Sequence, residues 1–137
     1  MSASKTLYTA KVHVTGGREG VARSSDGRLD IRLSTPGTPG PGTNPEQLFA
    51  AGWSACFEGA MVIAAKAKGV TLPEGTAIDA QVELRLGGDG YALAARLDVH
   101  VPGLDPEVAR QIIEAAHRTC PYSKAVKGNI ETLVALA

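Results

Sequence analysis

The sequence predicts an α+β fold, because strand-like and helical segments follow one another in the order strands, helix, strands, helix and strand. In the strand-like segments apolar and polar residues alternate as in a half-buried strand, and glycine-rich turns separate them. The two helical segments carry apolar residues at helical spacing. We therefore expect antiparallel sheets packed around two main helices.

The N-terminal quarter of the chain is predicted to form a small antiparallel meander. Residues alternate over Leu7–Val14, and a second arm runs over Val21–Ser24, turns at an Asp-Gly pair and continues over Leu29–Leu33. Residues 34–43 contain three prolines and three glycines, which fit neither a helix nor a central strand. We expect a loop there.

The longest helical segment starts at Thr43-Asn44-Pro45-Glu46. A capping side chain, a proline in the first turn and a glutamate three residues after Thr43 indicate a helix start, and Gly69 should stop the helix after Lys68. The middle of this segment is apolar or small nearly all round. Such a helix is expected to be buried on every side, and one sheet cannot cover all of it.

The second half of the chain is predicted to form a hairpin, a helix and a last strand. The hairpin strands span Ala77–Leu86 and Tyr91–Val101. The helix begins at Asp105-Pro106-Glu107 and must end by Cys120, because a proline follows and disfavours helical geometry in the residue before it. Residues 129–136 form the last strand. The length of 137 residues predicts one domain over residues 1–137.

The composition is typical of a folded globular protein, with 44% hydrophobic and 20% charged residues. Fourteen basic residues balance fourteen acidic ones without forming blocks, so we expect no nucleic-acid and no membrane partner. The apolar stretch Leu48–Ala65 contains glycine, serine and glutamate and fits a membrane span poorly, and the N-terminus lacks a secretory signal. We expect a cytoplasmic protein, in which a permanent disulfide is disfavoured.

The chain has two cysteines, Cys56 in the first helix and Cys120 at the end of the second. In a reducing compartment this pair indicates redox chemistry or metal binding rather than a structural cross-link. Taken alone, Cys56 is predicted to be an inert core residue, and Cys120, at a helix break, is predicted to be accessible. Helices on one sheet can approach within the Cα separation of about 7 Å that a disulfide needs, but the residues alone leave that open.

Other chemistries have weaker support in the sequence. A zinc site would combine His117, Cys120 and Cys56, but it lacks a Cys-x-x-Cys pair and a fourth ligand. No Gly-x-Ser-x-Gly element of a serine hydrolase occurs. The glycine-rich segment 16–20 precedes a strand rather than a helix, which argues against a phosphate loop. It predicts a turn, or a means of bringing Arg18 to a buried anionic group.

Two cysteine motifs give the sequence a specific resemblance. Residues 43–60, TNPEQLFAAGWSACFEGA, resemble the first cysteine motif of the organic hydroperoxide resistance (Ohr) proteins of the OsmC-like superfamily. Residues 120–125, CPYSKA, followed by Gly128-Asn129, are similar to their second motif, and residues 16–20 and 25–30 resemble their N-terminal hairpins. The likeness covers nearly the whole chain. The departures are Glu19, where asparagine is frequent, and Trp53, where tyrosine is common.

The resemblance implies an OsmC-like fold, an intertwined homodimer with active sites at the subunit interface, and reduction of organic hydroperoxides to alcohols. It makes Cys56 the peroxidatic cysteine, Cys120 the resolving cysteine, and Arg18 and Glu46 active-site residues. It implies a lipoylated protein or another dithiol as reductant, and neither a cofactor nor a metal. An OsmC-type peroxidase of broader preference and a non-enzymatic carrier of hydrophobic ligands are the alternatives.

The chemistry of the residues agrees with this resemblance. Peroxide is attacked by a thiolate, so Cys56 in an apolar setting needs a nearby cation such as Arg18. The apolar residues around the cysteines would line a substrate channel or belong to the plain core: Phe49, Trp53, Phe57, Met61 and Tyr122.

The spacing of Glu46 and Cys56 limits how Arg18 can serve both. Ten residues of continuous helix separate the two by about 15 Å along the axis. Either the helix breaks near Gly52, or the Glu46 and the Cys56 that contact one Arg18 belong to different chains. The apolar character of the helix favours different chains.

Overall fold

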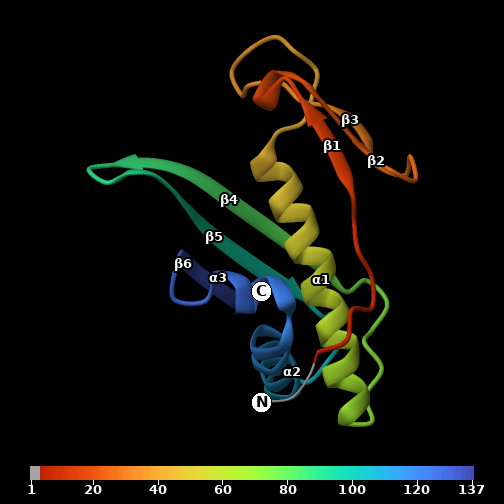
Figure 1. The fold of residues 1–137 in the computed structure, drawn as a ribbon. Helices are drawn as coiled ribbons and strands as arrows, with labels where there is room; N and C mark the ends of the chain where they lie inside the picture. Colours follow the sequence, from red (N-terminus) through yellow and green to blue (C-terminus); the bar gives the residue numbers. More distant parts are fainter. Residues whose placement is uncertain (1–3) are drawn as a thin grey trace. The chain divides into compact units, whose positions relative to one another are not determined.

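A computed structural model describes residues 4–137 as two compact units, residues 4–45 and residues 46–137 (Figure 1). The first unit holds a small sheet, and the second holds a larger sheet with three helices. The α+β class predicted from the sequence is confirmed.

The N-terminal unit is a three-stranded antiparallel sheet of β1 (Val12–Thr15), β2 (Val21–Ser24) and β3 (Asp30–Arg32), in that order. A short 3-10 helix, η1 (Gly17–Glu19), joins β1 to β2. The predicted start of the first strand at Leu7 is wrong. Because β2 already turns away at Ser24, which pairs with Val12, the preceding residues have no partner strand.

The loop over residues 34–43 is confirmed, and hydrogen bonds close its ends. The Ser34 N–H donates to the Thr43 carbonyl and the Thr43 N–H to the Arg32 carbonyl, both at 2.9 Å. Across the loop, the Gly42 N–H donates to Ser34 Oγ at 2.9 Å. Because its prolines lack a backbone N–H, this loop cannot form a regular strand, and these bonds satisfy the backbone groups at its two ends instead.

The second unit is built on a sheet of β4 (Ala77–Gly87), β5 (Gly90–His100) and β6 (Glu131–Leu136). The antiparallel β4–β5 hairpin is confirmed, but β6 pairs with β5 in parallel, so the expectation of purely antiparallel sheets is wrong here. The reason lies in residues 101–130. Their helices carry the chain back to the end where β5 began, as a parallel crossover requires.

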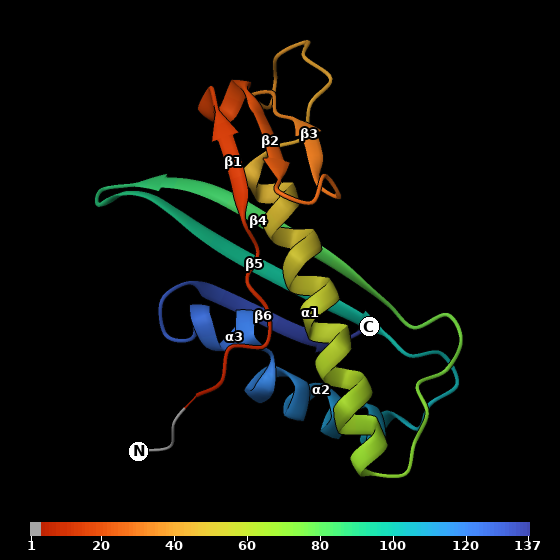
Figure 2. The same ribbon diagram turned by 45° about the vertical axis from the view of Figure 1, so that its right-hand side comes forward.

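Three helices complete this unit: α1 (Pro45–Ala67), α2 (Pro106–Thr119) and α3 (Pro121–Val126) (Figure 2). The predicted extents of the first two are confirmed, whereas α3 was not predicted. Because α1 starts at Pro45, Glu46 is its second residue and the capping box counted from Thr43 is one residue out of register. The helix runs through Gly52 without a break.

The core lies between the sheet and the two long helices. Buried residues of α1 and α2 form one cluster with inward-facing residues of β5. Its largest fully buried members are Trp53, Phe57, Met61, Leu97, Val99, Ile112 and Cys120. Both cysteine-bearing helices are therefore fixed to the same layer of packing.

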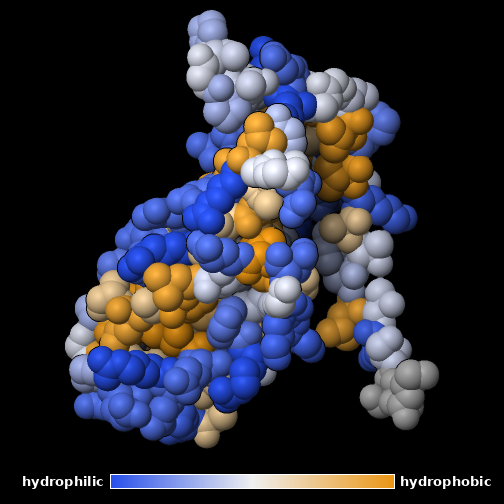
Figure 3. Space-filling model, turned by 90° about the vertical axis from the view of Figure 1, so that its left-hand side faces the viewer, coloured by the Kyte–Doolittle hydropathy of each residue, from blue (hydrophilic) through white to orange (hydrophobic). Residues whose placement is uncertain are grey.

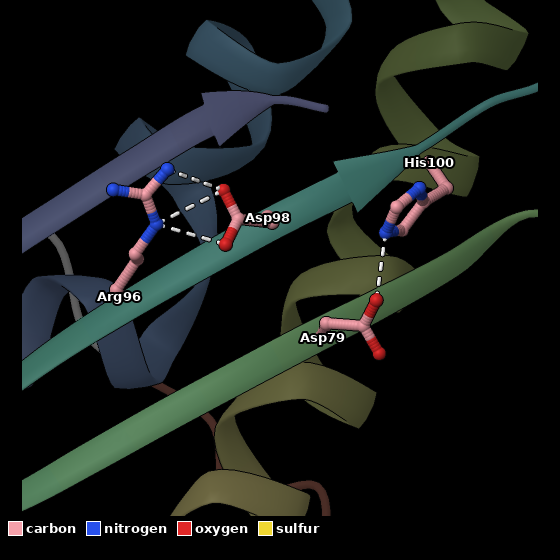
Figure 4. A network of polar contacts seen from close by, with 4 residues as sticks. All are labelled: Asp79, Arg96, Asp98 and His100. Atoms are coloured by element: carbon pink, nitrogen blue, oxygen red, sulfur yellow. Dashed lines mark hydrogen bonds and ion pairs between the residues drawn. The ribbon is translucent and has the colours of Figure 1, made fainter.

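The opposite face of the sheet is charged, since strand residues alternate between faces. Asp79 and Asp98 lie directly opposite each other on β4 and β5, and each carboxylate contacts a different side chain, His100 and Arg96 respectively (Figure 4). Arg96 donates three bonds to the two oxygens of Asp98, at 2.8, 2.9 and 3.1 Å, and His100 Nε2 lies 2.7 Å from Asp79. The guanidinium of Arg96 lowers the pKa of Asp98. The Arg96–Asp98 ion pair offsets part of the repulsion between the facing carboxylates.

Helix α1 is buried on one side only within the described chain. Its core-facing residues are Trp53, Phe57, Ala60, Met61 and Ala65, whereas Val62 and Ile63 are 52% and 73% exposed. Among residues 4–137, α1 is the one helix that is long and apolar enough to cross a membrane by length and composition. Core helices of folded domains meet the same criterion, and the packing of Trp53 and Phe57 is that of a core helix.

Candidate redox site

The two cysteines lie side by side although 64 residues separate them. Cys56 Sγ and Cys120 Sγ are 3.4 Å apart, and both residues are free thiols. A disulfide has an S–S length of about 2.05 Å, so closing the bond requires an approach of about 1.4 Å. The pair is chemically able to form a disulfide without a large movement of the backbone.

The joint between α2 and α3 places Cys120. Its backbone is extended, with φ −60° and ψ 122°, as a residue before proline requires. The Cys120 N–H still donates to the Ala116 carbonyl at 2.8 Å, and the Lys124 N–H donates to the Cys120 carbonyl at 2.9 Å. Cys120 therefore ends one helix and starts the next.

The burial of the two thiols is the reverse of the expectation. Cys120 is fully buried, so the prediction that it is accessible is wrong, and Cys56 is only partly buried. The cause is α3, which begins directly after Cys120 and packs against α2. A residue at a helix break is accessible only when the chain leaves the core there, and this chain does not.

The environment of Cys56 disfavours its thiolate. Burial raises the pKa of the Cys56 thiol, and the adjacent Cys120 thiol raises it further. The backbone N–H of Tyr122 donates to the Cys56 sulfur and lowers the pKa, opposing part of the effect of burial. A reactive Cys56 therefore needs further stabilisation of its charged form.

A buried hydrogen-bond chain lies next to the thiol pair. Trp53 Nε1–H donates to Ser123 Oγ at 3.0 Å, and His117 Nδ1 lies 3.0 Å from the same oxygen. Because the indole is only a donor, Ser123 accepts from Trp53 and its own proton is available to His117 Nδ1. Burial lowers the pKa of His117, and the charge of Lys127 lowers it further, which favours the neutral, accepting imidazole.

The bond between His117 and Ser123 weakens the case for a zinc site. His117 Nδ1 is engaged with Ser123 Oγ. Within residues 4–137 no group of three or more His, Cys, Asp or Glu side chains is arranged to hold a metal ion. Ser123 itself was missed by the sequence analysis. The only signal for it was a small polar residue three positions after a cysteine in a segment that should pack.

An aromatic group lies beside the chain of hydrogen bonds. The Phe49 ring is 5.5 Å from Trp53 and 6.2 Å from Tyr122, between ring centroids. Gly52 permits this packing, because a Cβ there would lie 2.9 Å from Tyr122 Oη. Five residues were expected to line a channel or belong to the core. Trp53, Phe57 and Met61 are fully buried in the core, whereas Phe49 and Tyr122 retain exposed surface.

The two charged candidates occupy different units. Arg18 lies in η1, in a turn that only glycine permits at its end, since a Cβ on Gly20 would lie 1.7 Å from the Thr15 carbonyl oxygen. Glu46 is in the first turn of α1. Because α1 is unbroken, Glu46 and Cys56 are about 15 Å apart along its axis, and the option of a break near Gly52 is excluded.

Comparison with known proteins decides the family. A family model described as OsmC-like protein matches residues 36–134. The organic hydroperoxide resistance protein of Xanthomonas axonopodis pv. citri (strain 306) is 46% identical over 140 aligned residues, which cover 99% of each chain. OhrB of Bacillus subtilis (strain 168) is 42% identical, over 95% of this chain and 98% of its own. The chain is a member of the Ohr proteins within the OsmC-like family.

Solved structures agree with this assignment. The crystal structure of OhrB of Bacillus subtilis has a TM-score of 0.91 at 41% identity, covering 96% of this chain and 100% of its own. An organic hydroperoxide resistance protein of Vibrio cholerae, with captopril bound in one of its active sites, has a TM-score of 0.91 at 40% identity, with coverage of 98% and 95%. The predicted resemblance and the OsmC-like fold are confirmed.

The two departures from the Ohr motifs have partners in this structure. The indole of Trp53 supplies the N–H that binds Ser123. The carboxylate of Glu19 accepts from Thr35 Oγ1 at 3.1 Å. In this Ohr protein the additional carboxylate beside Arg18 thus has a hydroxyl donor of its own.

Acidification is expected to destabilise the protein through His117. Folding lowers the pKa of His117, whereas a histidine in the unfolded chain has a pKa near 6.5. Below that pH the unfolded chain therefore binds more protons than the folded protein. The free energy of unfolding should therefore fall as the pH drops below about 6.5. A His117→Asn variant keeps an acceptor near the Nδ1 position but does not titrate, so urea unfolding between about pH 7.5 and pH 5.5 should show a smaller loss. Equal losses in both proteins would contradict this role.

Proposed function

We propose that this Ohr protein is a cysteine-based peroxidase that reduces organic hydroperoxides to alcohols in oxidative stress defence. The observation that carries the proposal is the 3.4 Å separation of Cys56 Sγ and Cys120 Sγ in a chain of this family. The curated relatives carry the name organic hydroperoxide resistance protein. The test is turnover of an alkyl hydroperoxide with a dithiol reductant.

Cys56 is the proposed peroxidatic residue, because it is the more accessible of the two thiols. Its thiolate attacks the outer peroxide oxygen, the O–O bond breaks, and the alkoxide leaves and takes a proton to give the alcohol. Cys56 is thereby oxidised to sulfenic acid. Cys120 then attacks the Cys56 sulfur, the S–S bond forms, and the hydroxyl leaves as water. Two thiols of a reductant return both cysteines to the reduced state.

A lipoylated protein or another dithiol is the proposed reductant, and an organic hydroperoxide is the substrate. A dithiol suits a partly buried disulfide, because its second thiol resolves the mixed disulfide within the same complex. Phe49 and Tyr122, which retain exposed surface beside Cys56, are the proposed contacts for an apolar tail of the substrate. A cytoplasmic location remains the prediction, since thiols stay reduced there.

Arg18 is the proposed cation that ionises Cys56, and Glu46 is the proposed carboxylate that orients it. Burial raises the pKa of Cys56, so a cation has to lower it for reaction near neutral pH. The unbroken course of α1 keeps Glu46 and Cys56 of one chain too far apart for one guanidinium to contact both. We therefore place Glu46 and Cys56 of a single site on different chains.

A homodimer follows from the same helix. The apolar side of α1 that its own chain leaves open includes Val62 and Ile63. Apolar surface is not confined to this helix: the face drawn in Figure 3 also has a patch of hydrophobic residues rimmed by hydrophilic ones. A second copy of α1 provides an apolar partner for Val62 and Ile63, and a symmetric pair closes the assembly at two chains.

The roles of the two cysteines make separate predictions. Cys56→Ser should abolish consumption of cumene hydroperoxide, because it removes the attacking thiol. Cys120→Ser should complete one turnover and leave Cys56 as sulfenic acid, which excess peroxide then overoxidises. Rapid-quench mass spectrometry measures both outcomes.

The opposite pattern would reverse the roles of the two cysteines. Cysteines that do not react with one equivalent of peroxide would favour a non-enzymatic ligand carrier. Faster turnover with hydrogen peroxide than with cumene hydroperoxide would favour an OsmC-type enzyme.

Removal of the Arg18 charge should raise the pH at which Cys56 ionises. Arg18→Met keeps much of the side-chain length, so we expect a slow enzyme whose thiolate forms only at higher pH. Absorbance of the thiolate near 240 nm, followed against pH in a Cys120→Ser background, measures the shift. Arg28→Met is the matched control, because Arg28 lies at a turn beside Asp26. An unchanged titration curve for Arg18→Met would reject the role of Arg18.

A shared site predicts complementation between inactive variants. If Arg18 comes from the chain that supplies Glu46, Arg18→Ala and Cys56→Ser chains that are unfolded together and refolded form heterodimers in which one of the two sites has both residues intact. Random pairing should recover about a quarter of the wild-type activity. Each variant refolded alone is the control. Heterodimers without turnover would place Arg18 and Cys56 of one site in the same chain, and an active monomer in sedimentation would reject the shared site.

A further inference from the structure

The turn from Cys120 to Ser123 presents three groups toward the thiol site. Cys120 Sγ lies 3.4 Å from Cys56 Sγ, and the backbone N–H of Tyr122 donates to the Cys56 sulfur. The third group is the hydroxyl of Ser123, which is 2% exposed. Four consecutive residues thus carry the second thiol, a donor to the first thiol, and a buried polar anchor.

Trp53 and His117, which bind the Ser123 hydroxyl, each lie three residues before one of the cysteines. Trp53 precedes Cys56 by three residues on α1, and His117 in the last turn of α2 precedes Cys120, the C-cap of that helix, by three residues. Residues three apart on a helix are neighbours on one face. Both bond to Ser123 Oγ at 3.0 Å. The hydroxyl therefore ties the turn to the helical face from which each thiol projects.

The anchor has little freedom to exchange these partners. Trp53 is fully buried, and its indole has a single N–H, which is already donated to Ser123. A buried hydroxyl that loses its partners retains a desolvation cost, so the arrangement with both bonds made is strongly preferred. The packing of Tyr122 against Gly52 restrains the same turn further.

We propose that Ser123 is a positioning residue for the thiol pair, whose hydroxyl, held between Trp53 and His117, fixes the turn that aims Cys120 Sγ and the Tyr122 N–H at Cys56. This inference rests on the proposed peroxidase function for its role in turnover. The anchor contacts neither substrate nor the reacting sulfur atoms, and it acts through the turn.

The step most sensitive to this anchor is disulfide formation. The Cys120 sulfur has to approach Cys56 by about 1.4 Å, form the S–S bond and displace hydroxide, which leaves as water. Misplacement of reacting groups by about 1 Å costs on the order of 100-fold in rate. Peroxide attack depends on the turn only through the Tyr122 N–H, so it should be affected less.

Ser123→Ala removes the hydroxyl, and Trp53→Phe removes one donor but keeps an aromatic ring. In single-turnover experiments with cumene hydroperoxide, we expect each variant to lengthen the lifetime of the Cys56 sulfenic acid at least about tenfold. Thiol trapping with dimedone measures that lifetime. Ser123→Thr keeps the hydroxyl and should restore much of the rate. Thr119→Ala is the matched control, since Thr119 adjoins Cys120 but its hydroxyl bonds to the Ala115 carbonyl of its own helix.

A second measurement separates this inference from the proposed function. Equilibration with reduced and oxidised glutathione gives the effective concentration of the two thiols toward each other without any peroxide. We expect a drop of about tenfold in Ser123→Ala and no change in Thr119→Ala. Unchanged values in Ser123→Ala and Trp53→Phe would overturn the positioning role. If the wild-type protein forms no sulfenic acid while Ser123→Ala still shows the drop, the peroxidase function is rejected and the positioning role is retained.

Discussion

The thiol pair depends on one backbone constraint, the proline that follows Cys120. Pro121 forces Cys120 into an extended conformation, so α2 ends there and α3 begins at once in a new direction. The change of direction buries Cys120 against α1 and brings the Tyr122 N–H to the Cys56 sulfur. The buried Ser123 hydroxyl then holds the new direction by linking α3 to both long helices.

The apolar character of α1 connects the fold to the proposed site. One side of the helix belongs to the core of its own chain, and the other side leaves large apolar residues such as Ile63 open. The same helix carries Glu46 and Cys56 at a separation that one guanidinium does not span. In the proposed homodimer, a second copy covers the open side and brings a second set of charged and thiol groups to the interface. On that proposal the same sequence segment determines both the assembly and the chemistry of the site.

The sequence predicted most elements, because periodicity, caps and turns are local signals. Helices α1 and α2, the β4–β5 hairpin and the meander around Asp26 follow from such signals. The misses depend on tertiary packing. Helix α3 is six residues long, too short for a periodic pattern, and it decides the burial of Cys120. The parallel pairing of β6 depends on the crossover over residues 101–130. Of the site, the cysteine motifs pointed to Cys56 and Cys120, but the hydroxyl of Ser123 has meaning only once Trp53 and His117 are adjacent to it.

The electrostatics of Cys56 explain why such a site needs more than its own helix. A thiol half-buried among apolar residues keeps its proton, and a neighbouring thiol strengthens that tendency. The single backbone donor from Tyr122 opposes it only in part. A resting thiol of this kind resists unwanted oxidation, since the thiolate is the reactive form. On the proposed mechanism the charge of Arg18 supplies the remaining stabilisation of the thiolate. The glycine-rich turn that carries Arg18 is then part of the reaction as much as the cysteines are.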